Sequence, residues 1–272
     1  MSMDWLHVTR SDAPLILAMP HTGSWLPPAL ADDFASRWIA LRDADWHVER
    51  LYDGLIDATI VRTAVSRSVI DCNRDPSGAS LYPGQATTEL CPTTTFDGDA
   101  LYRPGREPDD AAIAERRRRW FQPYHAALTA EIERLRALHP HIILYDCHAI
   151  RSRIPRLFDG ALPVFNLGTN GRSTCHSAVA QAALDASAAT GRSHVLDGRF
   201  RGGWTTRHYG RPAEGVHAIQ MELAIRAYAT EPDGAVAPAN WPPAWDEDRA
   251  GALRAELCQI LSAATDCIKE IA

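Results

Sequence analysis

The chain has 272 residues, of which 46% are hydrophobic, so it can bury a sizeable core and is not a disordered tail. Acidic residues outnumber basic ones by 34 to 28, and the formal net charge of -6 argues against nucleic acid as an obligatory partner. Any basic groups used in binding must therefore be gathered locally.

No segment reaches the ~18 uninterrupted apolar residues of a membrane span, and the first residues, MSMDWLHVTR, contain no signal-peptide apolar stretch. Six cysteines are present, and none of them forms a C-x-x-C pair: Cys72, Cys91, Cys147, Cys175, Cys258 and Cys267. This spacing fits reduced thiols and argues against a cysteine-based zinc site. We therefore expect a cytoplasmic protein with no membrane partner.

Short apolar runs alternate with longer amphipathic ones along the chain. The apolar runs predict strands at residues 14–20, 58–66, 68–73, 141–147, 162–168, 193–199 and 216–223. Apolar residues at helical spacing predict helices over about 46–57, 109–138, 172–190 and 246–270, with a weaker candidate at 29–41. Strands that alternate with helices in this way indicate an α/β sheet with helices on both faces.

Two segments lack such periodicity. Residues 75–108 are rich in Gly, Pro and Thr, and their interspersed apolar residues, among them Leu90, Phe96 and Tyr102, favour an ordered loop packed near a site. Residues 231–245 are rich in proline and predict a connector to the C-terminal helix. Because that helix is too short to form a core of its own, we expect a single domain over residues 1–272.

Polar residues lie at or near the ends of four predicted strands. His21 follows the first strand, Asn73 and Arg74 end the third, His148 follows the fourth, and Glu222 lies near the end of the last. In open α/β sheets, ligands bind beyond the carboxyl ends of the strands, where loops begin. The coincidence predicts that these residues share one site.

His148 has two interpretations. In a strand, Asp146 and His148 point to one side while Cys147 points to the other, so a Cys147–His148 nucleophilic pair would be geometrically poor. His148 is then either a metal ligand that a neighbouring carboxylate orients or a strand-end histidine bonded to the backbone. Because His21 occupies an equivalent setting, both interpretations stay open.

A hydrolytic zinc site needs three protein ligands and an open position for water. The segment LRDADWHVERLYDGL offers four further candidate ligands at a helix start: Asp43, Asp45, His47 and Glu49. An apolar stripe on this helix leaves Asp45 at the N-cap, where it could cap the helix, bind a metal, or do both.

Glu222 lies between Met221 and Leu223, and a carboxylate beside an apolar strand is costly to bury without a partner or a purpose. It is therefore either one half of an ion pair with an arginine or a general base that takes a proton from water. Arginines gather at residues 67–74 and 199–211, where their planar guanidinium groups could bind carboxylates.

These segments together resemble the N-formylglutamate amidohydrolase family. The stretches that carry the resemblance lie in order over residues 14–228 and include PHTGSWLP, DADWHVERLYD, SRSVIDCNRDP, YDCHAIRSRIPRLFDG and GRFRGGWTTRHYGRPAEGVHAIQMELA. The family is similar in fold to the zinc carboxypeptidases. The resemblance therefore implies an α/β three-layer sandwich, with a central mixed sheet covered by helices on both faces.

The resemblance also implies roles for individual residues. By position, it implies one divalent metal ion, Zn²⁺, held by His21, Asp45 and His148, with Glu222 as the acid/base. It further implies a carboxylate clamp made by Asn73 and Arg74. The remaining implied contacts, to a second carboxylate or to the developing oxyanion, are Arg67, Arg207 and His208.

The function expected from the resemblance is hydrolysis of N-formyl-L-glutamate to formate and L-glutamate, a late step of histidine degradation. A substrate with two carboxylates would explain an arginine-rich site in an acidic protein. Two alternatives stay open: hydrolysis of another N-acyl amino acid or small amide on the same fold, and a non-catalytic protein that binds an acidic metabolite.

Overall fold

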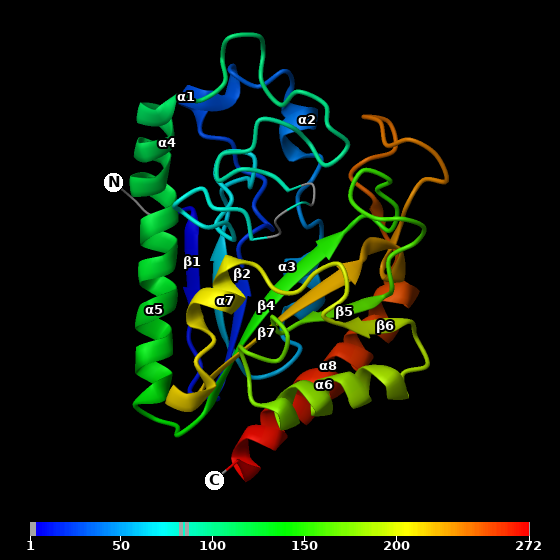
Figure 1. Cartoon of the computed structure of the whole chain (residues 1–272). Helices are drawn as coiled ribbons and strands as arrows, with labels where there is room; N and C mark the ends of the chain where they lie inside the picture. The colour runs from blue at the N-terminus through cyan, green and yellow to red at the C-terminus, as the bar shows by residue number, and fades with distance from the viewer. Residues whose placement is uncertain (1–3, 82–83, 85–86, 272) are drawn as a thin grey trace.

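The computed structural model describes residues 4–81, 84 and 87–271, and a mixed sheet of seven strands lies at its centre (Figure 1). The strands are β1 (Leu6–Thr9), β2 (Leu15–Met19), β3 (Thr59–Thr63), β4 (Ile142–Ile150), β5 (Phe165–Gly168), β6 (His194–Leu196) and β7 (Val216–Ala224). Their order across the sheet is β1-β3-β2-β4-β7-β5-β6. The central strands β3, β2, β4 and β7 are parallel, whereas β1 and β5 run antiparallel to their neighbours β3 and β7.

The helices flank this sheet, and a separate pair of short strands, β8 (Ala229–Thr230) and β9 (Ala244–Trp245), lies outside it. The helices are α1 (Pro28–Ala31), α2 (Arg37–Leu41), α3 (Val48–Tyr52), α4 (Asp110–Arg116), α5 (Gln122–Arg136), α6 (Ser177–Ala189), α7 (Trp204–Tyr209) and α8 (Glu247–Glu270). A π-helical turn at Arg117–Phe121 joins α4 to α5, and 3-10 turns occupy Pro212–Glu214 and Ile225–Ala227. No described helix is long and apolar enough to cross a membrane.

Strand β4 shows why the sheet is covered on both faces. Its nine residues are all buried, and successive side chains point to opposite faces. Ile143 and Tyr145 pack in a core with α3, α6 and α8, whereas Ile142 and Leu144 pack in a second core with α5. Helices on both sides of a mixed sheet confirm the predicted α/β arrangement (Figure 1).

Most predicted elements are present, but residues 68–73 do not form a strand. They make turns, because the Asp71 carboxylate accepts a hydrogen bond from the backbone N–H of Asn73 at 2.9 Å and bends the chain. The helix predicted at 46–57 is limited to α3, and the candidate at 29–41 is two short helices, α1 and α2. Strands β1, β8 and β9 and helix α7 were not predicted.

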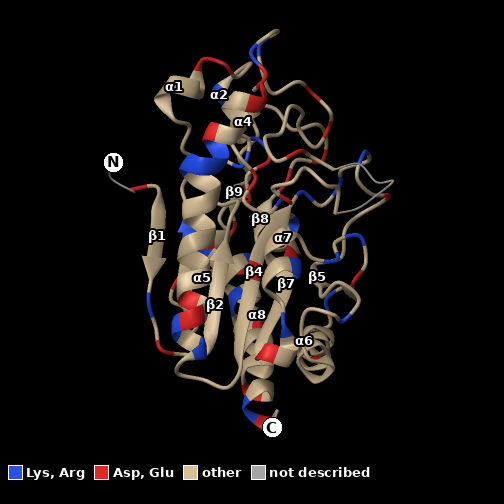
Figure 2. Ribbon diagram, turned by 60° about the vertical axis from the view of Figure 1, so that its left-hand side comes forward, with Lys and Arg blue, Asp and Glu red and all other residues tan. Residues whose placement is uncertain are grey.

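The long segment 75–108 has no helix or strand among its described residues, as predicted. Leu90, Phe96 and Tyr102 are nevertheless buried, so this part of the chain packs against the body of the protein. Figure 2 shows the central strands mostly uncharged, with many charged residues in the loops at one end of the sheet. That end contains the carboxyl termini of β2, β4 and β7, where the candidate site lies.

Candidate active site and metal centre

Four of the predicted site residues converge at this end of the sheet. His21 lies two residues beyond β2, and Asp45 precedes α3. His148 lies inside β4 rather than after a strand, because β4 continues to Ile150. In the parallel pairing of β4 with β7, His148 lies opposite Glu222. Segments far apart in the sequence therefore meet at one place.

His21, Asp45 and His148 form a compact group of potential metal ligands. One ligand atom from each lies within 4.8 Å of the others, and all three side chains are buried. The His148 Nδ1 atom lies 3.0 Å from an Asp45 oxygen, and the His21 Nδ1 atom lies 3.7 Å from the same oxygen. Among the described residues, no other set of three or more His, Cys, Asp and Glu side chains is close enough to hold an ion.

A second carboxylate lies behind each imidazole. Asp71 contacts Nε2 of His21 at 2.6 Å, and Asp146 lies 3.0 Å from Nε2 of His148. Both Nδ1 atoms therefore turn inward toward Asp45. The Nδ1 atom of His21 is buried and has no hydrogen-bond partner among the described residues. Two imidazole nitrogens and one carboxylate that face one another fit the ligand set of a divalent metal such as zinc. The contact of each outer ring nitrogen with a second carboxylate is also typical of such sites.

The position of the proton on the His148 ring decides whether the ring bonds Asp146 or the amide of Asn73. Asn73 Nδ2 lies 2.9 Å from Nε2 of His148, and Asp146 lies 3.0 Å from the same nitrogen. A ring nitrogen carries either a proton or a lone pair, so it can bond only one of these two groups. If Nδ1 binds a cation, Nε2 must carry the proton and donate it to Asp146. Asn73 Oδ1 meanwhile accepts from the N–H of Thr205 at 2.8 Å and so holds α7 beside the site.

Charged neighbours favour positive charge between the imidazoles. Burial raises the pKa of Asp45, but His21 and His148 lower it by more, so its pKa lies below the usual range. Burial lowers the pKa of His148, but Asp146 and Asp45 raise it well above its usual value. Arg67 bridges the two acids of the site, donating to Asp45 at 3.1 Å and to Asp71 at 3.0 Å.

Glu222 lies at the edge of this group and is 7% exposed. Burial raises the pKa of its carboxyl to about 8, partly offset by His148. Gln220 Nε2 donates to the Glu222 carboxylate at 3.4 Å, and Gln220 Oε1 accepts from the N–H of Gly203 at 2.7 Å. A carboxyl with a pKa near neutrality can both accept and return a proton.

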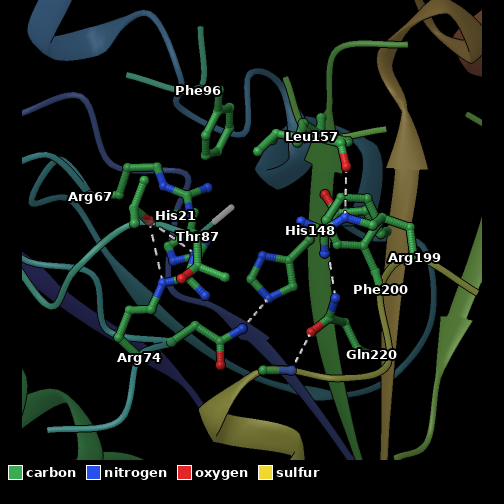
Figure 3. Close-up of a pocket in the computed structure, with 15 residues that line it drawn as sticks. His21, Arg67, Arg74, Thr87, Phe96, His148, Leu157, Arg199, Phe200 and Gln220 are labelled. Atoms are coloured by element: carbon green, nitrogen blue, oxygen red, sulfur yellow. Dashed lines mark hydrogen bonds between the residues drawn. The ribbon is translucent and has the colours of Figure 1, made fainter. Parts of the chain in front are cut away.

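These side chains line one pocket, whose arrangement Figure 3 shows. Six of the predicted site residues line it: His21, Arg67, Asn73, Arg74, His148 and Glu222. Asp45 is not among the residues that line the pocket, but its carboxylate contacts His148, which does. Nine further residues line the pocket: Thr87, Thr88, Phe96, Ile150, Leu157, Arg199, Phe200, Gly203 and Gln220. The sequence placed Phe96 in a loop near a site and Arg199 in a cluster of possible carboxylate-binding arginines, but assigned neither to this pocket. The pocket thus combines a group suited to a metal with arginines and an apolar wall.

Arg207 and His208, both on α7, are not among the described residues that line this pocket. Arg207 donates to the backbone carbonyls of Gly202 at 2.9 Å and Leu81 at 2.9 Å, which joins α7 to the 75–108 segment. His208 is exposed, and its ring stacks on Trp204 with the ring centres 4.6 Å apart. The structure does not bring these two side chains to the metal-binding group.

Asp71 is the supporting residue that sequence reasoning missed, because residues 68–73 were interpreted as an apolar strand. Its two oxygens contact His21 and Arg67, and the second also lies 3.3 Å from Nε of Arg74. The signal was an acid placed between two arginines in the segment SRSVIDCNRD. An isolated acid flanked by Arg67 and Arg74 could have been interpreted as the centre of an ion-pair network.

Comparison with known proteins identifies the family. A sequence model described as N-formylglutamate amidohydrolase matches residues 13–229. The chain is 44% identical over 264 residues to the N-formylglutamate deformylase of Pseudomonas aeruginosa, covering 94% of both chains. It is 42% identical to the enzyme of the same name from Pseudomonas putida, covering 92% of this chain and 91% of that one.

Solved structures share the fold at lower sequence identity. The N-formylglutamate amidohydrolase from Ralstonia eutropha JMP134 is 20% identical, with a TM-score of 0.77 and coverage of 98% of this chain and 99% of that one. A gene product from Agrobacterium tumefaciens is 17% identical, with a TM-score of 0.69 and coverage of 97% and 96%. The fold and the sequence matches define an enzyme of the amide-hydrolase class. Within that class, the chain belongs to the N-formylglutamate amidohydrolase family.

Proposed function

We propose that this chain hydrolyses N-formyl-L-glutamate to formate and L-glutamate. The observation that carries the proposal is the buried group of His21, Asp45 and His148 at a pocket that also contains Arg67 and Arg74. Such a pocket combines groups that activate an amide carbonyl with groups that bind carboxylates. The names of the two Pseudomonas relatives support this choice of substrate.

The proposal includes a divalent metal, with Zn²⁺ as the expected ion, held by His21, Asp45 and His148. The mixture of two imidazoles and one carboxylate is a ligand set of hydrolytic zinc sites, which supports the choice of zinc. A divalent ion held by these three residues would polarise the formyl oxygen and would lower the pKa of a bound water from 15.7 to about 7. Asp71 and Asp146 hold the two rings so that their inner nitrogens face Asp45, where the ion would be held.

Glu222 is the proposed acid/base. Its carboxylate takes a proton from the attacking water and later delivers that proton to the amide nitrogen, which leaves as the amine of glutamate. The pKa raised by burial suits both steps, because the group exchanges its proton near neutral pH. Gln220, which donates to Glu222, holds the carboxylate in place.

Arginines and Asn73 are proposed to bind the substrate carboxylates. Arg74 lines the pocket and donates to Thr88 Oγ1 at 3.0 Å, so it is oriented before substrate arrives. Arg67 has N–H groups left after its bonds to two acids, and these are proposed to face the developing oxyanion. Arg207 and His208 do not line the pocket, so they are not proposed as direct contacts to substrate; Arg207 is proposed to hold α7 against the 75–108 segment, which supplies Thr87 and Thr88 to the pocket.

The test is release of formate from N-formyl-L-glutamate by the purified enzyme, before and after removal of metal by a chelator. We expect turnover by the metal-loaded enzyme, loss of turnover after chelation, and recovery when Zn²⁺ is added. Full turnover by protein shown to be metal-free would contradict the metal role. Absence of turnover by metal-loaded protein would contradict the substrate assignment.

We also propose that the reaction serves histidine degradation in the cytoplasm. The substrate is a formylated amino acid, and the six cysteines are all free, two of them only partly buried, which suits a reducing compartment. Growth of a deletion strain on histidine as nitrogen source tests the pathway. Cell fractionation tests the location.

A further inference from the structure

Phe96 lies at the metal-binding end of the pocket, in a segment for which no role has been assigned. We propose that Phe96 sets the upper size of the acyl group that the enzyme accepts, and that ion pairs of the buried Arg42 and Arg151 with Asp97 and Asp99 hold it in position. This inference rests on the proposed function, because it assumes an N-acyl amino acid as substrate.

One side of the pocket is apolar. Phe96, Ile150, Leu157 and Phe200 line it. Phe96 and Ile150 belong to a small buried hydrophobic cluster separate from the two main cores, and Leu157 and Phe200 pack against that cluster. In Figure 3, Phe96 and Leu157 lie together on one side of the pocket, whereas Arg74 lies across from them. An apolar wall cannot bind a carboxylate, so the uncharged part of the substrate must face it.

The contacts of Phe96 place it next to the scissile end of a substrate. Its ring lies 4.8 Å from the guanidinium carbon of Arg67, and Arg67 in turn donates to Asp45 at 3.1 Å. Only one side chain therefore separates Phe96 from a potential metal ligand. Because the acyl carbon must reach that ligand group to react, the substituent on this carbon is the part of the substrate nearest Phe96.

A hydrogen atom is the smallest substituent an acyl carbon can carry, and acetyl replaces it with a methyl group. A rigid wall rejects that extra carbon, whereas a mobile wall would move aside. The proposal therefore needs Phe96 to be held firmly. The chain around it supplies that support in two ways.

The backbone of Phe96 lies in a closed turn. The N–H of Thr95 bonds the carbonyl of Asp99 at 2.9 Å, and the N–H of Gly98 bonds the carbonyl of Thr95 at 3.0 Å. Gly98 has φ of 95°, a conformation that glycine adopts without a steric penalty. The N–H of Phe96 itself donates to the buried carboxylate of Asp43 at 2.7 Å.

Ion pairs then fasten this turn to the segments that carry the metal-binding group. Asp97 lies 2.7 Å from Arg151 and 3.1 Å from Arg42, and Asp99 lies 2.8 Å from Arg42. Both arginines are buried, so removing an acid leaves a buried charge poorly paired. Arg42 and Asp43 precede Asp45 in sequence by a few residues, and Arg151 follows His148 similarly. The position of Phe96 is thus tied to the position of the metal-binding group.

The test compares hydrolysis of N-formyl-L-glutamate and N-acetyl-L-glutamate by the metal-loaded wild type, Phe96→Ala and Phe158→Ala. Phe158 is the matched control, because it packs against the same apolar cluster but does not line the pocket. In Phe96→Ala, we expect the acetyl-to-formyl ratio of kcat/KM to rise at least about tenfold, since one carbon in an apolar pocket typically changes discrimination by 10- to 200-fold. The ratio should stay near the wild-type value in Phe158→Ala.

Two further measurements distinguish a size-limiting role of Phe96 from a purely structural role. Calorimetry should show tighter binding of N-acetyl-L-glutamate to Phe96→Ala than to wild type, at equal metal content. Asp97→Asn should also raise the acetyl-to-formyl ratio of kcat/KM, but by less. This variant weakens the support of Phe96 and leaves the phenyl ring itself in place. If Phe96→Ala does not fold, Phe96→Leu makes the same comparison with a smaller loss of volume.

An unchanged ratio and unchanged acetyl binding in a folded, formyl-active Phe96 variant would overturn the inference. Equal loss of both activities without tighter acetyl binding would do the same, since that pattern indicates a structural role. Failure of the proposed function is seen separately, because the wild type would then release no formate from N-formyl-L-glutamate at all.

Discussion

Glu222 lies opposite His148 across the β4–β7 pair, close enough to serve the reacting groups but outside the group that could hold a metal. Glu222→Gln keeps the shape of the side chain and removes its ability to take a proton. We expect kcat to fall by about 10²- to 10⁴-fold, with the metal content unchanged. Formate release and elemental analysis of the same preparation measure both. A variant with near-normal kcat would exclude Glu222 as the acid/base.

Asp71 is expected to act through His21 rather than on substrate. Its Oδ1 atom contacts the outer nitrogen of that ring at 2.6 Å, so Asp71→Asn should weaken orientation of the ring. We expect metal affinity to fall by about 10- to 100-fold in a chelator competition experiment. Asp75→Asn is the control, because Asp75 lies only four residues further along the chain and its carboxylate accepts hydrogen bonds from Ser77, away from His21. Equal affinity in both variants would contradict the role of Asp71.

At the residue scale, sequence reasoning found the side chains that lie at strand ends and missed those that depend on the tertiary fold. His21, His148 and Glu222 could be chosen because parallel strands bring their carboxyl ends together. Phe96 was expected only in a loop near a site, since nothing near it in the sequence shows that it packs against Arg67. Asp71 was hidden inside an apolar segment that turns instead of extending.

At the element scale, the long periodic segments were predicted, whereas several short elements were missed: β1, β8, β9 and α7. Strands β4 and β7 and helices α5 and α8 have nine or more residues each, which gives a pattern enough repeats to be recognised. Helix α7 has six residues and begins after Gly203, whose absent Cβ would lie 2.4 Å from the Asn73 amide. Its position depends on that close approach and on the bond from Thr205 to Asn73.

Helix α5 carries a histidine that should make stability depend on pH. Burial lowers the pKa of His125 to about 4 from an ordinary value of 6.5, and the neutral ring bonds the carbonyl of Cys72 and the hydroxyl of Tyr209. Between these values the unfolded chain binds a proton that the folded chain does not. The contribution to stability is therefore complete above pH 6.5 and is lost as pH falls toward 4.

Urea unfolding of wild type and His125→Gln at pH 7 and pH 4.5 measures this contribution. Between the two pH values, we expect the wild type to lose about 2 kcal/mol more of its unfolding free energy than the variant loses. Release of any bound metal at low pH affects both proteins equally and cancels in the comparison. Parallel losses in the two proteins would show that His125 is not the titrating group.

At the scale of the whole molecule, the sheet determines which segments meet. Strand order β2-β4-β7 brings His21, His148 and Glu222 together although they are widely spaced in the sequence. The alternation of strands and helices was enough to predict an α/β sheet covered on both faces. The antiparallel direction of β1 and β5 has no local signal, because it depends on connections between distant segments. The single domain over residues 1–272 stays a prediction.

A metal that binds between β2, α3 and β4 should stabilise the whole fold. A free-ion concentration of about 100 times the dissociation constant adds about 2.7 kcal/mol to the free energy of unfolding. For a chain of this size, that gain raises Tm by about 5–10 °C. We therefore expect a chelator to lower Tm by that amount and Zn²⁺ to restore it. The chelator should leave Tm of His148→Ala almost unchanged. Equal shifts in both proteins would mean that the ion binds elsewhere.

The buried group of His21, Asp45 and His148 could hold a metal ion, and the proposed function depends on one catalytic divalent ion bound there. Elemental analysis combined with formate release, on wild type and His148→Ala purified in parallel, tests it most directly. We expect about one divalent ion per wild-type chain, and a folded variant that has lost both the ion and formate release. A His148→Ala variant that keeps the ion and turns over N-formyl-L-glutamate normally would contradict it.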